Sequence, residues 1–569
     1  MPSEIMKANH FGNHLHGRDH FNGRLWTSFA AIAAWLALGA QAYAGWFSSD
    51  PPLASAPEFG VFETSFKSST VITNPLEDVT LKVAFTSPAG EVSVVRGFWD
   101  GGKTWKVRFS PDLLGKWKFH TTCSDPVDFG LNDISGEFLC MATVGQSSFA
   151  VHGPVRVARD HRHLEFADHT PFFWVADTVW DGAVESKPAD WAYYAQARSV
   201  QGFNVAQWVA APEHDAEKMA AYNGTDPLQI NLEFFKKMDA KVAELNRAGI
   251  LNAIVAHGEI SLQGTNIFPA LPEPQTISLL RYMVARWGAN DVVWVLTCDG
   301  TDLGRCRHIL HSVFGDITHA PVIMYPGDAY WVLDRFRKEP LVDVFGYQSG
   351  QDTADDSLAW LLFGPVAKDW KRDPTRPWIN LAPAFENEPA GPDQLRNSAA
   401  AVRRAAYWSV LHTPANGVSY GGHDVWDWNT NIETSAGEAG YQTIALWQKA
   451  LFMPAAKKMG VLADFFNSID FWRLHPAPEL IANQPGLQAP GRFVAAAITD
   501  NKDLAVVYVP EDREVELNVK ALSATSTAYW IDPATGARAP VTISFDSQTC
   551  KLSTPNAGDW LLLIQAGGK

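Results

Sequence analysis

Residues 376–386, RPWINLAPAFE, decide the fold of this chain because they join a buried strand to a polar end. The apolar run stops at small residues and then at Glu386. Residues 292–300, VVWVLTCDG, have the same form and reach Asp299. Two apolar strands that end in carboxylates, within one region of alternating strands and helices, are what a TIM-barrel glycosidase needs.

Apolar strand patterns alternate with helical patterns between about residues 155 and 470. Strands are expected at 171–176, 203–209, 250–256, 292–298, 321–325, 342–347, 377–381 and 416–420. Helices are expected at 188–200, 229–247, 275–287, 303–314, 355–362 and 396–411. This alternation predicts an α/β fold, a (β/α)8 TIM barrel over 155–470. The alternative, a doubly wound sheet, would usually carry a glycine-rich phosphate loop after its first strand, and none is present.

The segments on both sides of the barrel contain strands and turns. Residues 61–150 alternate apolar and polar positions, as in 79–85 (VTLKVAF), and predict an N-terminal β-sandwich. Residues 471–569 predict a C-terminal β-sandwich, whose role is either packing on the barrel or binding a polymer or surface. Residues 45–60 are expected to form a linker.

The first 44 residues have the pattern of a secretory signal peptide. An apolar run from Trp26 to Leu38 is followed by an Ala-Tyr-Ala cleavage site at 42–44. The run is short for a membrane span, so an uncleaved anchor is the weaker interpretation and a secreted or periplasmic protein is expected. The net charge of −16 argues against nucleic acid or an anionic membrane as a partner.

The five cysteines are scattered and imply no disulfide framework. Cys123 and Cys140 lie in one strand-rich segment and could pair, whereas Cys298 and Cys306 are expected to be free. No Cys/His spacing resembles a zinc site, so neither a metal nor another cofactor is expected. The sequence does not predict the oligomeric state.

Functional residues of a TIM barrel collect where its strands end. Glycosidic cleavage needs one carboxylic acid and a second carboxylate, and we assign these roles to Asp299 and Glu386. Polar and aromatic side chains at the other strand ends suit sugar hydroxyls and ring faces. The candidate substrate-binding residues are Asp177, Trp180, Gln207, His257, Tyr347, Gln348, Tyr420, His423 and Trp426.

Each candidate also has a structural interpretation. Asp299 precedes a glycine and could cap a helix or form a turn, and Glu386 could be a solvated loop residue. His257 and His423 could be structural hydrogen-bond partners. Asp177 could cap the following helix, although Trp180 close behind it favours substrate.

Four segments resemble the apiosidase-like glycoside hydrolases: 173–180 (FWVADTVW), 202–207 (GFNVAQ), 347–350 (YQSG) and 420–423 (YGGH) with Trp426. Residues 97–102 (GFWDGG) resemble a β-domain of unknown function found ahead of that barrel. The last hundred residues are similar to the "putative collagen-binding" β-domain that often follows it. The resemblance implies a barrel that hydrolyses glycosides, with apiose release from pectin as its known theme and carboxylates after strands four and seven.

The chain departs from this family at strand seven, where the pattern Glu-Pro-x-Tyr-Glu becomes Ala382-Pro383-Ala384-Phe385-Glu386. The family's Gln-Ser-Gly-His also becomes residues 348–351, QSGQ. Three alternatives follow for the nucleophile: Glu386 serves, nearby Glu388 serves, or the barrel keeps carbohydrate binding without catalysis. A surface adhesion protein that works through the C-terminal domain is a further alternative.

Overall fold

The structure is a computed structural model of the 569-residue chain. It describes residues 53–569 except for short internal segments and the last three residues. The residues outside the description are 1–52, 212–214, 216, 225, 258–260, 263–264, 267–270, 299–301, 327–331, 351–352, 391–394, 432–444, 512 and 567–569.

The N-terminal domain is a β-sandwich of a five-stranded and a three-stranded sheet. The first sheet contains β1 (Ala54–Pro57), β8 (Ser135–Met141), β7 (Gly115–Cys123), β3 (Leu81–Thr86) and β4 (Val92–Arg96). The second contains β2 (Phe62–Lys67), β6 (Thr104–Phe109) and β5 (Phe98–Trp99). Alternate residues of β3 and β6 are buried between the sheets, as expected from the alternation in the sequence.

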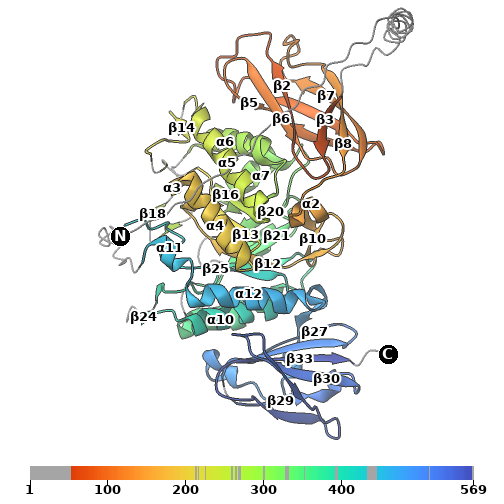
Figure 1. Ribbon diagram of the computed structural model, residues 1–569, viewed down its shortest axis with the longest axis vertical. Coiled ribbons are helices and arrows are strands. Elements are labelled where there is room, and N and C mark those ends of the chain that lie inside the picture. Colours follow the sequence, from red (N-terminus) through yellow and green to blue (C-terminus); the bar gives the residue numbers. More distant parts are fainter. Residues whose placement is uncertain are drawn as a thin grey trace, which may run out of the picture. The chain divides into compact units, whose positions relative to one another are not determined.

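Eight parallel strands close into a barrel (Figure 1). They are β12 (Trp174–Thr178), β13 (Val205–Val209), β16 (Leu251–His257), β19 (Val292–Thr297), β20 (Val322–Tyr325), β21 (Val344–Gln348), β22 (Trp378–Ala382) and β25 (Gly417–Gly421). Each overlaps one of the eight predicted strands, so the predicted fold class is confirmed. A small sheet of β9 (Val155–Val157), β10 (Leu164–Phe166) and β11 (Pro171–Phe172), with α2 (Ser148–His152), packs against the barrel interior.

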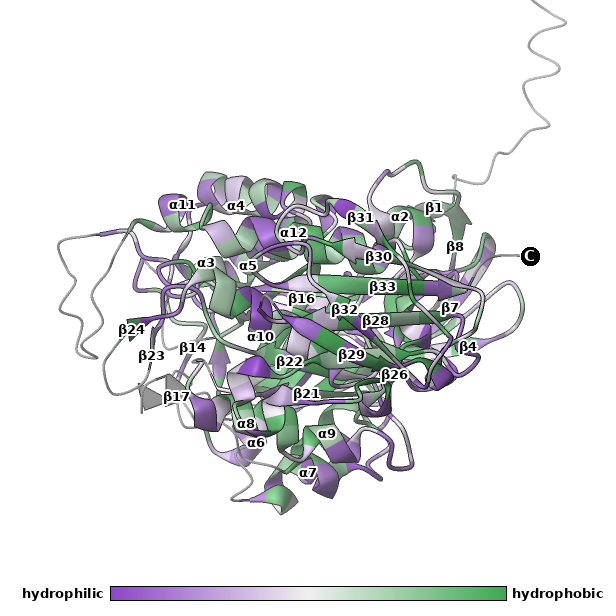
Figure 2. Ribbon diagram, turned by 90° about the horizontal axis from the view of Figure 1, so that it is seen from below, coloured by the Kyte–Doolittle hydropathy of each residue, from purple (hydrophilic) through white to green (hydrophobic). Residues whose placement is uncertain are grey.

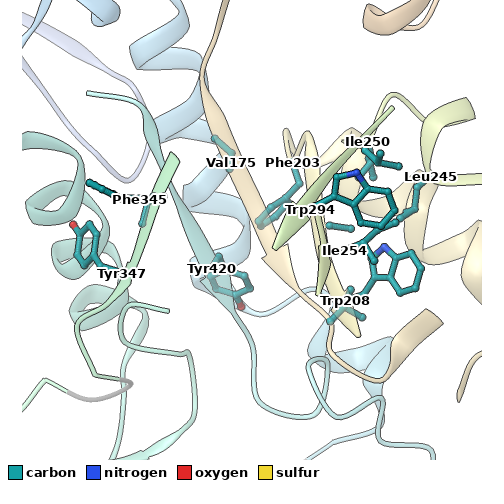
Figure 3. Close-up of a cluster of buried hydrophobic side chains, with 14 of the residues drawn as sticks. Val175, Phe203, Trp208, Leu245, Ile250, Ile254, Trp294, Phe345, Tyr347 and Tyr420 are labelled. Carbon is teal, nitrogen blue, oxygen red and sulfur yellow. The ribbon is translucent and has the colours of Figure 1, made fainter. Parts of the chain in front are cut away.

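Successive side chains of the barrel strands alternate between two hydrophobic layers. The inner layer fills the barrel and includes Val205, Val293 and Ile323. The outer layer lies between strands and helices, and Figure 3 shows its Trp208 and Trp294 beside Ile254. Burying each large apolar side chain stabilises the fold by about 1.5–3 kcal/mol, which is why these strands are apolar on both faces.

The helices surround the barrel. They are α3 (Gly182–Glu185), α4 (Pro188–Val200), α5 (Leu232–Arg247), α6 (Glu273–Trp287), α7 (Leu303–Phe314), α8 (Asp355–Phe363), α9 (Val366–Asp369), α10 (Ala399–Leu411), α11 (Trp447–Ala450) and α12 (Pro454–Asn467), with the 3-10 helix η1 (Leu333–Phe336). Three two-stranded sheets lie in the connections: β14–β15 (Tyr222–Asn223, Gln229–Ile230), β17–β18 (Ser261–Leu262, Thr265–Asn266) and β23–β24 (Pro389–Ala390, Leu395–Arg396). None of the helices in the described part of the chain is both long and apolar enough to cross a membrane.

The C-terminal domain is also rich in strands. A six-stranded sheet contains β26 (His475–Pro476), β27 (Ala495–Ile498), β28 (Leu504–Val509), β33 (Trp560–Ala566), β30 (Ser526–Ile531) and β31 (Arg538–Val541), and β29 (Glu514–Asn518) pairs with β32 (Thr549–Ser553). The 3-10 helices η2 (Phe471–Arg473), η3 (Pro478–Leu480), η4 (Pro485–Leu487), η5 (Pro490–Arg492) and η6 (Val519–Ala521) lie at its edges. The central strands β28 and β33 are strongly hydrophobic (Figure 2), because one face of the sheet packs on α10.

Buried arginines join both β-domains to the barrel. Arg286 of α6 binds Asp239 of α5 through two nitrogens and donates to Asp100 of the N-terminal domain at 3.2 Å. Arg403 of α10 pairs with Asp559 of the C-terminal domain, which also accepts the hydroxyl of Tyr508. A buried arginine left without its carboxylate is strongly destabilising, so these pairs tie the domains together.

The prediction for Cys298 and Cys306 was wrong, and the pairing left open for Cys123 and Cys140 does not form. Cys298 and Cys306, expected to be free, form a disulfide that joins the end of β19 to the first turn of α7, where the chain brings their Cα atoms to 6.3 Å. Cys123 and Cys140 are buried and unpaired. In the register of β7 and β8, Cys140 lies opposite Gly115, eight residues along β7 from Cys123, and this separation of about 27 Å is far too long for a disulfide.

Candidate active site

Aromatic side chains line the inner layer where the barrel strands end. Trp180, Tyr325, Phe385 and Trp426 are buried and belong to the cluster that fills the barrel. Tyr325 donates its hydroxyl to Oε1 of Gln348 at 2.7 Å, which holds that amide at the end of β21. These residues form the mouth of the barrel, where TIM-barrel enzymes bind their substrates.

Glu388 is the carboxylate of this mouth on the strand-seven side. Its Oε2 accepts Nε1 of Trp426 at 3.2 Å and lies 3.0 Å from Nδ1 of His423. Among the described residues, none donates a hydrogen bond to the second carboxylate oxygen of Glu388, Oε1. Burial lowers the pKa of His423, but the hydrogen bond and charge of Glu388 more than offset this and raise it overall. The result is a buried carboxylate–imidazole pair beside the aromatic cluster.

Glu386, predicted as the second catalytic carboxylate, faces the other way. Its carboxylate accepts the backbone N–H of Ala455 at 2.9 and 3.0 Å and the hydroxyl of Tyr420 at 2.7 Å. Ala455 is in the first turn of α12, so Glu386 caps that helix from behind the barrel wall. Burial raises the pKa of Glu386 despite these bonds. This geometry favours a structural role for Glu386 and leaves Glu388 as the carboxylate of the mouth.

Asp177 is part of the same outer layer. Arg198 of α4 donates to both carboxylate oxygens, at 2.7 and 3.2 Å, and the hydroxyl of Tyr194 donates to Oδ2 at 2.8 Å. Asp177 and Arg198 are completely buried. The predicted sugar ligand is thus placed in an ion pair that joins β12 to α4.

Three further predicted ligands are buried away from the mouth. Tyr347 and Tyr420 belong to the outer layer (Figure 3), where Tyr420 also lies under the guanidinium of Arg198. Gln207 is inside the barrel, where its amide donates to the carbonyl of Leu381 at 3.1 Å and accepts the hydroxyl of Ser419 at 3.1 Å. In these positions all three residues brace the barrel.

Trp180, Gln348, His423 and Trp426 are the predicted ligands that the fold places around the mouth. Asp299 lies outside the described residues, as does the side chain of His257. Their predicted roles therefore stay predictions. The disulfide Cys298–Cys306 spans the segment that carries Asp299, and β19, the strand before it, is paired with the strand of Tyr325.

Two acidic residues of the mouth, Asp181 and Asp427, were not predicted from the sequence. Each directly follows a tryptophan of the cluster, and the N–H of Asp181 donates to the carbonyl of Trp426 at 3.2 Å. Burial raises the pKa of Asp181 to about 7 and that of Asp427 to about 6. The Trp-Asp pair repeated at the ends of the first and last barrel strands was the signal that could have identified them.

The residues that the structure describes include no group of three histidine, cysteine or acidic side chains able to hold a metal ion. The groups assembled at the mouth are carboxylates, an imidazole, an amide and aromatic rings. Such groups bind hydroxyls and ring faces and can exchange protons with a bound substrate.

Comparison with known proteins agrees with this architecture. Residues 158–473 match the family described as "Apiosidase-like, catalytic domain". Residues 55–124 match a domain of unknown function, DUF5060, and residues 476–565 match the "Putative collagen-binding domain of a collagenase". A search of curated proteins found no match.

Solved structures with a similar fold include proteins titled as glycoside hydrolases. One glycoside hydrolase is 19% identical with a TM-score of 0.65 and covers 75% of this chain and 99% of its own. A protein from Bacteroides vulgatus ATCC 8482, titled a "putative glycoside hydrolase", is 16% identical with a TM-score of 0.66 and covers 90% of this chain and 99% of its own. At these identities the likeness shows the fold. Since the family match spans more than half of the chain, the chain belongs to the apiosidase-like family of glycoside hydrolases.

Proposed function

We propose that the protein is an exported glycoside hydrolase that cleaves a plant-type or other complex polysaccharide with two carboxylates. In this proposal Asp299 is the general acid/base and Glu388 replaces Glu386 as the second carboxylate. The single observation that carries it is the placement of Glu388 beside His423, Trp426 and the aromatic mouth. A glycosidase needs its second carboxylate where the sugar binds, and Glu386 is engaged behind the wall.

The test is a screen of the mature protein against pectic and other plant or bacterial oligosaccharides, followed by Asp299→Asn and Glu388→Ala on any substrate that it cleaves. We expect each replacement to lower turnover by about 10²–10⁴-fold, because acid–base assistance is lost. Partial restoration of Glu388→Ala by added azide or formate would support Glu388, since a small anion can occupy the space of the missing carboxylate. Unchanged turnover in either variant would exclude its assignment.

A binding protein without catalysis is the second candidate, favoured by Ala382. This residue stands where the family has its leading glutamate, and it is fully buried in the inner layer. A scaffold can keep its pocket and lose its chemistry. Saccharide binding by calorimetry without any product by chromatography would establish this alternative.

Export is supported by the segment 1–44 and by the Cys298–Cys306 disulfide, since disulfides persist mainly in oxidising compartments. Secretion from the natural host followed by N-terminal sequencing should give Gly45 as the first residue. A protein that still begins at Met1 would contradict cleavage.

A further inference from the structure

A second concave site lies between the barrel and the C-terminal domain. This junction cavity has a volume of about 750 Å³ and is lined by Phe363, Lys368, Trp370 and Lys371 from the barrel side and by His475 and Glu479 from the other domain. Its volume is within the roughly 300–1,000 Å³ of ligand pockets, and domain junctions are common places for them.

The junction cavity is separate from the barrel mouth. Helix α8 starts after β21 ends and runs back along the barrel. The C-terminal end of α8, together with α9 and Trp370, therefore lies on the side where the barrel strands begin. Trp370 precedes β22, whereas the mouth residues follow the strands. A ligand in this cavity would therefore bind independently of the reaction.

Aromatic rings form an uncharged floor in the junction cavity. The ring of Phe493 meets Phe363 edge-on at 5.6 Å and His412 at 5.4 Å. Burial lowers the pKa of His412 to about 4, so this imidazole is neutral near pH 7. Beside them the half-buried indole of Trp370 lies nearly parallel to the His475 ring, at 23° and 6.1 Å between centroids. Flat rings with accessible faces are suited to the apolar face of a sugar.

The rim of the junction cavity carries cations on a protein whose net charge is −16. Lys368 and Lys371 are exposed, and neither has an ion-pair partner among the described residues. Their neighbour Arg372 is occupied by Asp334 at 2.8 Å. One carboxylate, Glu479, lines the opposite wall and can accept hydroxyl hydrogens. Two unpaired ammonium groups next to an indole match a ligand that combines a ring face with a negative charge.

We propose that the junction cavity binds a carboxylated saccharide, with a sugar ring on Trp370 and its carboxylate near Lys368 and Lys371. It would hold an acidic polysaccharide on the enzyme without taking part in hydrolysis. The proposal stands whether or not the barrel mouth is catalytic, because it rests on different residues.

The test is calorimetry of the full mature protein with trigalacturonic acid and with its methyl ester, which keeps the rings and removes the charge. We expect wild type to bind the acid at least tenfold more tightly than the ester. Trp370→Ala should weaken binding at least tenfold, and Trp370→Phe should restore part of it. Lys368→Ala combined with Lys371→Ala should remove the preference for the acid, whereas Lys103→Ala, an exposed lysine of the N-terminal domain, should change nothing.

Three results would overturn the proposal: no binding by wild type, equal binding of acid and ester, or binding that survives Trp370→Ala. Thermal melting of each variant controls for folding. Hydrolysis of a small neutral glycoside, too short to reach the cavity, should be equal in wild type and Trp370→Ala. That separate measurement distinguishes failure of this site from failure of the proposed hydrolase.

Discussion

Glu386 and Glu388 are separated by a single residue, yet Glu386 lies behind the barrel wall and Glu388 lies at the barrel mouth. Asn387 between them has a φ of 62°, in the left-handed region that asparagine tolerates better than most residues. The turn directs Glu386 to the N-terminus of α12 and Glu388 to His423 and Trp426. Hydrogen-bond partners, and not proximity to a strand end, therefore separate a structural carboxylate from a candidate catalytic one.

The largest expected effect is on turnover, in Glu388→Gln. The amide keeps the size of the side chain but cannot act as a base or nucleophile, so the rate should fall by about 10²–10⁴-fold. Initial rates on a cleaved substrate measure this, and Glu386→Gln is the matched control because it makes the same change on the other side of the wall. Comparable rate losses in both folded variants would break the distinction.

The next effect is on stability, in Asp177→Asn. Removing one charge of a buried ion pair should cost about 3–5 kcal/mol, because Arg198 is left uncompensated. Denaturant unfolding measures the loss, and KM of the fraction that remains folded should equal that of wild type. A raised KM without a loss of stability would instead indicate that Asp177 contacts the substrate.

Glu386→Gln should lower the free energy of unfolding by a smaller amount, about 1–3 kcal/mol, because buried hydrogen bonds to Tyr420 and Ala455 are weakened. Tyr420→Phe removes one of these bonds from the other side. In a double-mutant cycle the two losses should be less than additive, because the residues share a contact. Strict additivity would show that the bond contributes little.

The smallest expected effect is on the pH dependence of stability, in Asp427→Asn at the barrel mouth. Burial raises the pKa of Asp427 to about 6, above the value of about 3.9 in an unfolded chain. The folded state therefore holds this proton more tightly, and the associated stability is present below about pH 4 and lost as the pH rises through 6. Asp427→Asn should reduce that loss by roughly 1–2 kcal/mol, allowing for partial solvent access. The free energy of unfolding is measured at pH 4.5 and at pH 8 for wild type and for Asp427→Asn. An equal change between the two pH values in both proteins would contradict this prediction.

The barrel strands could be predicted from the sequence because each one is mainly apolar and lies between helical patterns. Residues 292–297 show this, with every side chain buried. The sequence does not show which side chains point into the barrel, because residues of the outer layer and of the inner layer both have apolar neighbours in the chain. Asp177, Tyr347 and Tyr420 were therefore expected in the pocket, but their side chains lie in the outer layer. Asp177 pairs with Arg198 of α4, and Tyr347 lies against Trp360 of α8. Helix α10 packs on β25, the strand of Tyr420.

The identity of the mouth carboxylate could not be predicted, because it depends on the backbone conformation of Asn387 and on two residues 35 and 38 positions after Glu388, His423 and Trp426. The Cys298–Cys306 disulfide depends likewise on how sharply the chain turns from β19 into α7. Hydrophobic periodicity carries no information about such turns.

The arginines at the two domain junctions bear on how this protein could have evolved. Arg286 and Arg403 are buried and take their carboxylate partners partly or wholly from a neighbouring domain. A gene rearrangement that kept only residues 155–470 would preserve every barrel strand and the Arg286–Asp239 pair, but it would leave Arg403 without Asp559. Exchange of the C-terminal domain would therefore destabilise the barrel unless the incoming domain placed a carboxylate where Asp559 lies.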